Sequence, residues 1–300
     1  MPELAEVEFF RKRWHLAAAG RRITSVALHR GAKVFRGTDP RLIEETLPGT
    51  RFETSEAAAK QMLFRFSGGH WLGIHLGMSG DLDTKLPDYT PQKHDHLVLT
   101  TAKQSLVFSD PRMFGRVQFH VGKEPPPWWT KIAPAILSSE FNAATVSAFL
   151  TRRKKASLKA VMLMQEQFPG IGNWMADEIL WRAGLHPKRL AGSLIPTEVK
   201  ILVRQCRTVC RQALAKIAGK GDELPDDLNV NIPETWLFRH RWREGGRCPK
   251  TNVRLIREDV GGRTTCWSPA RQPSPESLLR ARSGGAATRA RRKIGGGRHR

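Results

Sequence analysis

The sequence predicts an α+β chain in which an N-terminal helix leads into an antiparallel β-sandwich, and a helical domain follows. Three observations support this fold class. Residues 4–14 repeat apolar side chains at helical spacing, residues 21–121 break into short, partly alternating apolar runs, and residues 158–218 return to helical spacing. A chain of 300 residues, 40% of them hydrophobic, can build two moderate-sized domains with a core each.

The charge of the chain indicates its partner. A formal net charge of +22 disfavours self-association and attracts polyanions, so we expect a monomer that binds nucleic acid, although exported basic proteins and ribosomal proteins share this property. No apolar run is long enough to span a membrane, and the acidic start does not suit a signal peptide. These features predict a cytoplasmic, nucleoid-associated protein without a membrane partner. Four cysteines are too few for a disulfide scaffold.

The first helix places an unusual group at its start. Leu4, Val7, Phe10 and Trp14 share one face, and proline suits the first turn of a helix. If Met1 is removed, Pro2 becomes a secondary amine, and an α-amino group has a pKa of roughly 7.7–8. Such an amine can attack a sugar C1′ and form an iminium without a metal or cofactor. A Met-Pro start alone is common, however, and does not establish this chemistry.

The middle of the first half alternates as strands do. Gly, Pro, Asp and Ser separate the short runs, which is typical of an antiparallel sandwich or flattened barrel. We expect strands at 23–28, 60–66, 71–75, 96–100, 106–108 and 116–121. The proline-rich segment 124–135 then predicts a linker.

A glycine turn organises the second half. A helical run over 158–167 stops at Pro169 and Gly170, and another run starts after Gly172, which places Asn173 at an N-cap. Because glycines have no side chain, a phosphate can approach the backbone amides at a helix N-terminus there. The same pattern alone would also suit an ordinary helical hairpin.

Two stretches together carry a resemblance to a known family. The segment 168–187, FPGIGNWMADEILWRAGLHP, and the start PELAEVE at residues 2–8 resemble the formamidopyrimidine-DNA glycosylase and endonuclease VIII family. The resemblance covers about residues 2–270. It implies a helix-two-turn-helix around the glycine turn and a C-terminal β-hairpin finger. It also implies a DNA glycosylase that excises oxidised bases through a Schiff base and cleaves abasic sites by β- or β,δ-elimination.

The family motifs assign roles to particular residues. By resemblance, Pro2 is the nucleophile and Glu3 the acid that assists ring opening, while Glu6 orders water or the sugar. Lys60 and Arg263 would bind phosphates near the lesion. Further DNA contacts implied by resemblance are a wedge that fills the vacated base stack, two basic contacts and the glycine turn: Met78, Arg112, Phe114, His94, Lys155, Gly170, Gly172 and Asn173.

The finger departs from the family pattern. The family has two CxxC pairs that bind zinc, whereas this chain has Cys248 and Cys266 with Thr251 and Pro269 at the other two positions. Two thiolates cannot complete a tetrahedral site, so we expect a hairpin held by packing, with no zinc and no cofactor; zinc with borrowed ligands is the alternative. Residues 219–235 do not resemble the stretch that leads to the base-capping loop, and Ala5 replaces a proline.

The predicted organisation has five segments. These are a catalytic sandwich domain at 1–123, the linker at 124–135, a helix-two-turn-helix domain at 136–235, the finger at 236–270 and a basic disordered tail at 271–300. The expected partner is duplex DNA with damaged bases or abasic sites. A non-catalytic protein that binds damaged or bent DNA is the alternative function, and the choice between oxidised purines and oxidised pyrimidines stays open.

Overall fold

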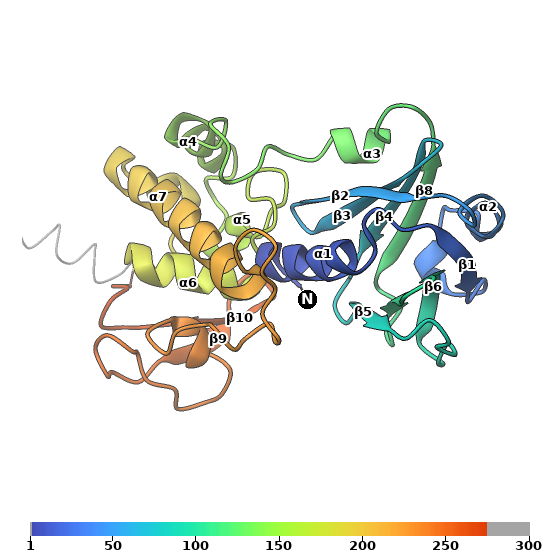
Figure 1. Ribbon diagram of the computed structural model, residues 1–300. Helices are drawn as coiled ribbons and strands as arrows, with labels where there is room; N and C mark the ends of the chain where they lie inside the picture. Colours follow the sequence, from blue (N-terminus) through green and yellow to red (C-terminus); the bar gives the residue numbers. More distant parts are fainter. Residues whose placement is uncertain (1, 275–300) are drawn as a thin grey trace, which may run out of the picture. The chain divides into compact units, whose positions relative to one another are not determined.

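The computed structural model describes residues 2–274, which form an α+β fold as expected (Figure 1). The first half contains helices α1 (Leu4–Ala18), η1 (Lys33–Phe35) and α2 (Pro40–Thr46) and strands β1 (Ile23–Leu28), β2 (Phe52–Ala58), β3 (Gln61–Phe66), β4 (His70–His75), β5 (Asp81–Lys85), β6 (Asp95–Thr101), β7 (Ser105–Ser109) and β8 (Arg116–Val121). The second half contains α3 (Pro127–Thr130), α4 (Ala143–Arg152), α5 (Leu158–Met162), α6 (Asn173–Ala183), η2 (Ala191–Ser193), α7 (Pro196–Ala213), η3 (Leu214–Ala218), η4 (Leu237–Arg239), β9 (Ile256–Asp259) and β10 (Thr264–Trp267).

Two antiparallel sheets form the expected sandwich. One has the strand order β1-β6-β7-β5 and the other the order β2-β3-β4-β8. The predicted strands all form, and 116–121 matches β8 at both ends. Central strands such as β3, β6 and β7 bury most of their residues, since their apolar side chains pack inside the sandwich.

Helix α1 closes onto this sandwich through its aromatic face. Val7, Phe10 and Trp14 are buried, and the Trp14 ring packs at 5.1 Å from that of Phe64 in β3. The indole of Trp14 donates a hydrogen bond of 3.0 Å to the carbonyl of Asp83 in β5. The predicted apolar face of the helix therefore anchors the start of the chain to both sheets.

Two strands lack the apolar alternation that would predict them. β2 has the sequence FETSEAA and fully buries only Phe52, but its backbone pairs with β3 from Phe52–Phe66 to Ala58–Gln61. β5, with the sequence DLDTK, is positioned in the same way by β7. Lys60 lies in the turn between β2 and β3, not at the first position of a strand, and Ala59 beside it has a φ of 55°.

The proline-rich segment after β8 packs against the sheet. A Cβ added to Gly73 in β4 would lie 2.2 Å from the ring of Trp128, so the indole rests directly on the backbone of that strand. Residues 127–130 form the short helix α3. The segment that the sequence predicts as a linker thus contributes one of its aromatic rings to the sandwich.

The helices around the glycine turn differ in length from the prediction. α5 ends at Met162, earlier than the expected 167, and irregular backbone leads into the turn. The Gln165 side chain binds this backbone, since its amide donates to the Ile171 carbonyl at 2.9 Å and its carbonyl accepts from Gly170 N–H at 3.0 Å. The long helix expected at 196–218 is present as α7 and its π-helical continuation η3.

The C-terminal hairpin pairs β9 with β10 from Ile256–Trp267 to Asp259–Thr264. Its position depends on Asp177 in α6, which is fully buried. The Asp177 carboxylate accepts the backbone N–H of Cys266 at 2.9 Å and pairs with Lys159 at 2.5 Å and with Arg241 at 2.6 Å. Two buried cations and one strand therefore share a single buried carboxylate.

The chain divides into two compact units. The first unit comprises the described residues up to Phe141, together with Met164–Met175 and Cys206–Ile232. The second unit comprises Asn142–Leu163, Ala176–Gln205 and the described residues from Pro233 on. The first residues of the expected tail are packed in the second unit, where the Gln272 amide donates to the Leu185 carbonyl at 2.9 Å. Residues 275–300 lie outside the described residues. No helix within 2–274 is both long and apolar enough to cross a membrane.

Candidate active site

The start of the chain is bound to the glycine turn. The Glu3 carboxylate, 2% exposed, accepts three backbone hydrogen bonds at 2.9, 2.9 and 3.1 Å, from the N–H groups of Gly172, Trp174 and Met175. Leu4 N–H donates to the Gly170 carbonyl at 3.0 Å. A carboxylate at the N-terminus of α6 suits the partial positive charge there. The half-buried Pro2 is consequently held beside the turn.

At both glycines of the turn, other parts of the protein occupy the place that a Cβ would take. A Cβ on Gly172 would lie 2.3 Å from Glu3 Cδ, and Gly170 has a φ of 83° with the place of its Cβ 2.8 Å from the Leu4 side chain. The expectation that a phosphate approaches these amides is wrong for Gly172, because Glu3 accepts its N–H. Asn173 is the first residue of α6 and not its N-cap, since the distant Glu3 carboxylate takes the capping role.

A second carboxylate lies beside the first. Glu6 accepts the indole N–H of Trp174 at 2.8 Å through one oxygen and the backbone N–H of Glu3 at 3.2 Å through the other. Burial raises the pKa of Glu3 to about 7, and the neighbouring charge of Glu6 adds to the rise. Burial also raises the pKa of Glu6. Two coupled carboxyls of this kind can keep a proton near neutral pH, as a general acid requires.

The sequence does not distinguish Lys60 from a solvated surface lysine, but the structure does. Its side chain is 7% exposed, at the tip of the β2–β3 turn. The turn touches the glycine turn, since the place of a Cβ on Gly170 is 3.1 Å from the Ala59 carbonyl. The Lys60 charge opposes the rise in the pKa of Glu3, and it adds to the burial that lowers the pKa of His75. Lys60 therefore lies within electrostatic reach of the carboxyl pair.

The three expected wedge residues lie on two loops that are joined. Met78 and Phe114 are 47% and 50% exposed, and the Arg112 guanidinium stacks on the Phe114 ring at 4.7 Å. Asp110 connects the loops, because its carboxylate accepts from Ser79 Oγ at 2.6 Å and from Gly115 N–H at 2.6 Å. Asp110 is not among the residues predicted from the sequence, although an acid directly before Pro-Arg at the end of a strand is a signal for such a turn.

The remaining expected contacts are exposed. His94 precedes β6, and its carbonyl accepts Asp110 N–H at 3.0 Å, so it adjoins the wedge loops. Lys155 lies in the turn between α4 and α5, and Arg263 lies in the β9–β10 turn. Lys155 and Arg263 both belong to the second unit, whereas Pro2, Glu3, Glu6 and Lys60 belong to the first. The first unit alone therefore assembles the candidate nucleophile, acid and buried lysine.

The finger residues do not fit a four-thiolate zinc site. Cys248 and Cys266 lie in an apolar cluster with Trp181, Leu237 and Leu255. Burial raises the pKa of Cys248, but hydrogen bonds led by that from Thr251 outweigh this and lower it to about 7; burial raises the pKa of Cys266 to about 12. Over residues 2–274 no three His, Cys, Asp or Glu side chains are arranged to hold a metal. A finger without zinc stays a prediction, and Asp177 is the anchor that the sequence did not indicate.

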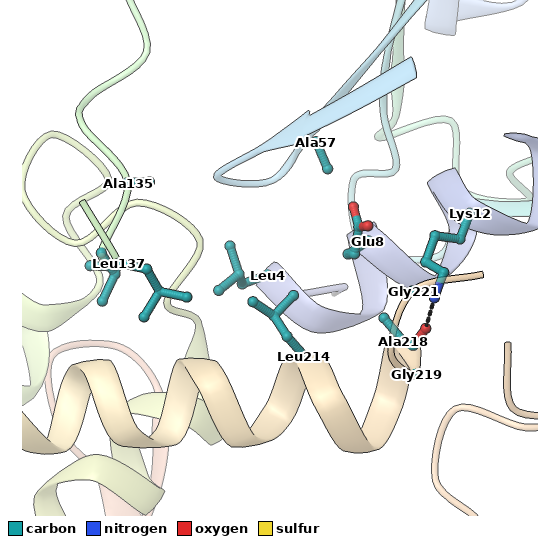
Figure 2. Close-up of a pocket in the computed structure, with 11 residues that line it drawn as sticks. Leu4, Glu8, Lys12, Ala57, Ala135, Leu137, Leu214, Ala218, Gly219 and Gly221 are labelled. Atoms are coloured by element: carbon teal, nitrogen blue, oxygen red, sulfur yellow. Dashed lines mark hydrogen bonds between the residues drawn. The ribbon is translucent and has the colours of Figure 1, made fainter. Parts of the chain in front are cut away.

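A pocket of about 340 Å³ is lined in part by Leu4, Glu8 and Lys12 of α1 (Figure 2). It is mostly apolar, with Leu4 and Leu214 projecting into it, and Lys12 lies at one end. The Lys12 ammonium donates to the carbonyls of Ala218 and Glu223 at 2.6 and 2.5 Å. The pocket contains none of the candidate catalytic groups, so it is not the place of the chemistry.

Comparison with known sequences places both halves of the chain. Residues 1–117 match the formamidopyrimidine-DNA glycosylase N-terminal domain, and residues 132–222 match the H2TH domain of formamidopyrimidine-DNA glycosylase. A formamidopyrimidine-DNA glycosylase of Laribacter hongkongensis is 35% identical over 280 residues, which cover 91% of this chain and all of the relative. One from Desulfitobacterium hafniense is 31% identical, again over 91% of this chain and all of the relative.

Solved structures agree with these matches. The Lactococcus lactis formamidopyrimidine-DNA glycosylase bound non-covalently to DNA with an abasic site has a TM-score of 0.77 and 25% identity, over 91% of this chain and all of that chain. The same enzyme bound to DNA with an oxidised pyrimidine has a TM-score of 0.79 with 24% identity over the same shares, which shows the shared fold.

Proposed function

The chain belongs to the formamidopyrimidine-DNA glycosylase family, and from this premise we propose that it excises oxidised bases from duplex DNA and then cleaves the resulting abasic site. Its partner is DNA with a damaged base or an abasic site, of the kind bound by its L. lactis relative. The protein acts as a monomer without zinc or another cofactor. Its general place among DNA repair glycosylases follows from the family, and the steps below are the proposal.

The proposed reaction starts at Pro2 after removal of Met1. The amine nitrogen uses its lone pair to form a bond to C1′, the bond from C1′ to the base breaks, and the base leaves with the electron pair and takes up a proton. The nitrogen then loses its proton as the sugar ring opens to an iminium, and Glu3 donates a proton to the ring oxygen. Loss of a C2′ proton expels the 3′ phosphate, and if the reaction proceeds to β,δ-elimination, a second elimination expels the 5′ phosphate.

One observation carries the proposal most directly. The Glu3 carboxylate next to Pro2 is buried, lies on the N-terminus of α6 and has a pKa raised to about 7 by burial and by Glu6. A non-catalytic DNA-binding protein has no need for a protonated acid beside an amine. Burial of Lys60 in reach of this acid supports the same reading. Positioning and covalent catalysis would supply the acceleration.

The other residues have roles in holding the DNA. Met78, Arg112 and Phe114 fill the space that the flipped nucleotide leaves, and their joined loops keep them in place. Asn173, His94, Lys155 and Arg263 bind the DNA backbone. Gly170 and Gly172 contribute by letting Leu4 and Glu3 approach the turn.

Borohydride trapping on duplex DNA with one abasic site tests the proposal. Reduction of the Schiff base should give a covalent adduct of protein and DNA in the wild type and none with Pro2→Gly or with an uncleaved N-terminal tag. If a variant still binds abasic DNA but gives no adduct, the substitution has removed the covalent reaction and not the DNA binding. A wild type that binds this DNA and forms no adduct would instead identify a non-catalytic binder.

The lesion preference needs a separate measurement. The enzyme is assayed on duplexes that contain 8-oxoguanine, formamidopyrimidine or thymine glycol, each compared with a duplex that has a plain abasic site. The relative rates show whether it prefers oxidised purines or oxidised pyrimidines. The products of abasic-site cleavage, resolved on a denaturing gel, distinguish β- from β,δ-elimination. An enzyme that cleaves abasic sites but none of the three base-containing duplexes would contradict the proposed excision.

A further inference from the structure

Trp174 contacts both carboxyls of the candidate acid pair. Its backbone N–H donates to Glu3 Oε1 at 2.9 Å, and its indole N–H donates to Glu6 Oε1 at 2.8 Å. The side chain is 3% exposed, in the first turn of α6. One residue therefore reaches Glu3 through its main chain and Glu6 through its side chain.

The hydrogen bonds to the two carboxyls are unequal without the indole. Glu3 accepts three backbone N–H groups from the glycine turn, whereas Glu6 accepts that of Glu3 and, more locally, its own. Hydrogen bonds from N–H donors favour the ionised carboxylate, so this difference alone would keep Glu3 ionised and leave the proton on Glu6. The indole N–H gives Glu6 one further donor and reduces the difference.

The charged groups around the pair have opposing effects, so they do not decide by themselves whether Glu3 or Glu6 holds the proton. Lys60 from the β2–β3 turn favours ionisation of Glu3, while the charge of Glu6 opposes it. On the side of α7, Glu3 faces Cys210, whose buried thiol has its pKa raised first by burial and then by Glu3. Because the two carboxyls interact strongly, a change at Glu6 must appear in the titration of Glu3 as well.

We propose that Trp174 is a positioning residue that holds Glu6 in its ionised form and so leaves the shared proton of the pair with Glu3. This inference rests on the proposed function of Glu3 as the acid. Without the indole N–H, Glu6 takes the proton. Glu3 is then deprotonated at a lower pH than in the wild type. The Trp174 side chain at the glycine turn thus decides which of two carboxyls can act as the acid.

Titration of the two carboxyl carbons by NMR in ¹³C-labelled protein tests this directly and does not depend on activity. Trp174→Phe keeps an aromatic ring and removes the donor. We expect the midpoint of Glu6 to rise by about one pH unit and that of Glu3 to fall, because a hydrogen bond to a charged group is worth about a tenfold change in the proton equilibrium. Glu3→Gln and Glu6→Gln assign the signals.

Activity gives the second readout. In the pH–rate profile of single-turnover excision, the fall in rate on the alkaline side should occur about one pH unit lower in Trp174→Phe than in the wild type. In a Glu6→Gln background, which has no second titrating carboxyl, Trp174→Phe should not move this limb. A merely structural role would give the same change in both backgrounds.

Two variants exclude trivial explanations. Trp71→Phe is the matched control, since the Trp71 indole donates to the Gly122 carbonyl at 2.9 Å on strand β4 and should leave the titration of both carboxyls unchanged. If Trp174→Phe does not fold, a benzothienylalanine at position 174 keeps the ring shape and removes only the N–H. Unchanged Glu3 and Glu6 midpoints in a folded variant overturn the inference, whereas a wild type without activity but with the expected titration contradicts the proposed function instead.

Discussion

At the scale of single residues, Glu3 combines two tasks that oppose each other. As a cap of α6 it accepts three backbone N–H groups, which favours its ionised form. As a buried carboxyl next to Glu6 it is pushed toward the protonated form, and the second effect is larger, because its pKa lies at about 7. A carboxyl that folding brings close to neutrality is suited to donate a proton at physiological pH.

This pKa predicts a pH dependence of stability. Because the pKa of Glu3 rises from 4.5 to about 7 on folding, the folded state holds a proton that the unfolded state loses at lower pH. The stabilisation is complete below pH 4.5 and disappears as the pH rises through about 7. The free energy of unfolding should fall by about 3 kcal/mol over this range on account of Glu3.

Urea unfolding at a series of pH values measures this slope. Glu3→Gln, which cannot titrate, should flatten it by the same amount relative to the wild type. Glu53→Gln serves as the control, since Glu53 is an exposed residue of β2 paired with Arg65. Equal slopes for wild type and Glu3→Gln would mean that Glu3 does not hold a proton in the folded state.

At the scale of elements, the two wedge loops act as one rigid support for exposed side chains. Phe114→Ala should leave the fold intact, because the ring is 50% exposed, and change stability by less than about 0.5 kcal/mol. Excision from a duplex with a damaged base should fall about 10- to 100-fold, since the vacated stack stays unfilled at a cost of a few kcal/mol. Single-turnover kinetics measures the loss.

Leu86→Ala is the matched control for this wedge, as another exposed apolar residue of the first unit. It should keep the wild-type rate. A loss as large in Leu86→Ala as in Phe114→Ala would attribute the effect to general surface changes and remove the wedge role.

The hairpin finger gives the second prediction at this scale. Asp177→Ala should destabilise the protein by about 3–5 kcal/mol, because it leaves the buried cations Lys159 and Arg241 without their carboxylate and the Cys266 N–H without its acceptor. Thermal unfolding measures this effect. Glu244→Ala, which breaks the exposed pair with Arg257, should cost less than about 1 kcal/mol, and similar losses for both variants would contradict the role of Asp177.

At the scale of the whole molecule, charge sets the salt dependence of DNA binding. Residues 275–300 carry a net charge of +7, so the rest of the chain keeps +15. Removal of residues 275–300 should weaken binding to undamaged duplex DNA and reduce the slope of log affinity against log salt, since fewer counterions are released. Fluorescence anisotropy at several salt concentrations measures both, and an unchanged slope would show that these residues do not contact DNA.

Much of the fold can be predicted from the local sequence pattern. Where this prediction fails, pairing between strands or a side-chain contact with the backbone is the cause. The apolar runs predict the central strands because most of the side chains of these strands are buried. β2 and β5, in contrast, have polar sequences and exist through pairing with β3 and β7. The helix expected at 158–167 ends at Met162, since the Gln165 side chain binds the backbone of the turn. Competition of this kind between side chain and helix is not visible in periodicity.

The amino-acid sequence by itself determined the family, the two-part α+β fold and the identity of the candidate catalytic groups, because motifs and periodicity are properties of neighbouring residues. Only the tertiary structure decided what these groups do to each other. Glu3 meets Gly172 and Trp174 across about 170 positions of chain, so neither the protonation of this acid nor the reason for the glycine can be seen locally. Burial and long-range hydrogen bonds shift a pKa only once folding has removed water and brought distant partners together.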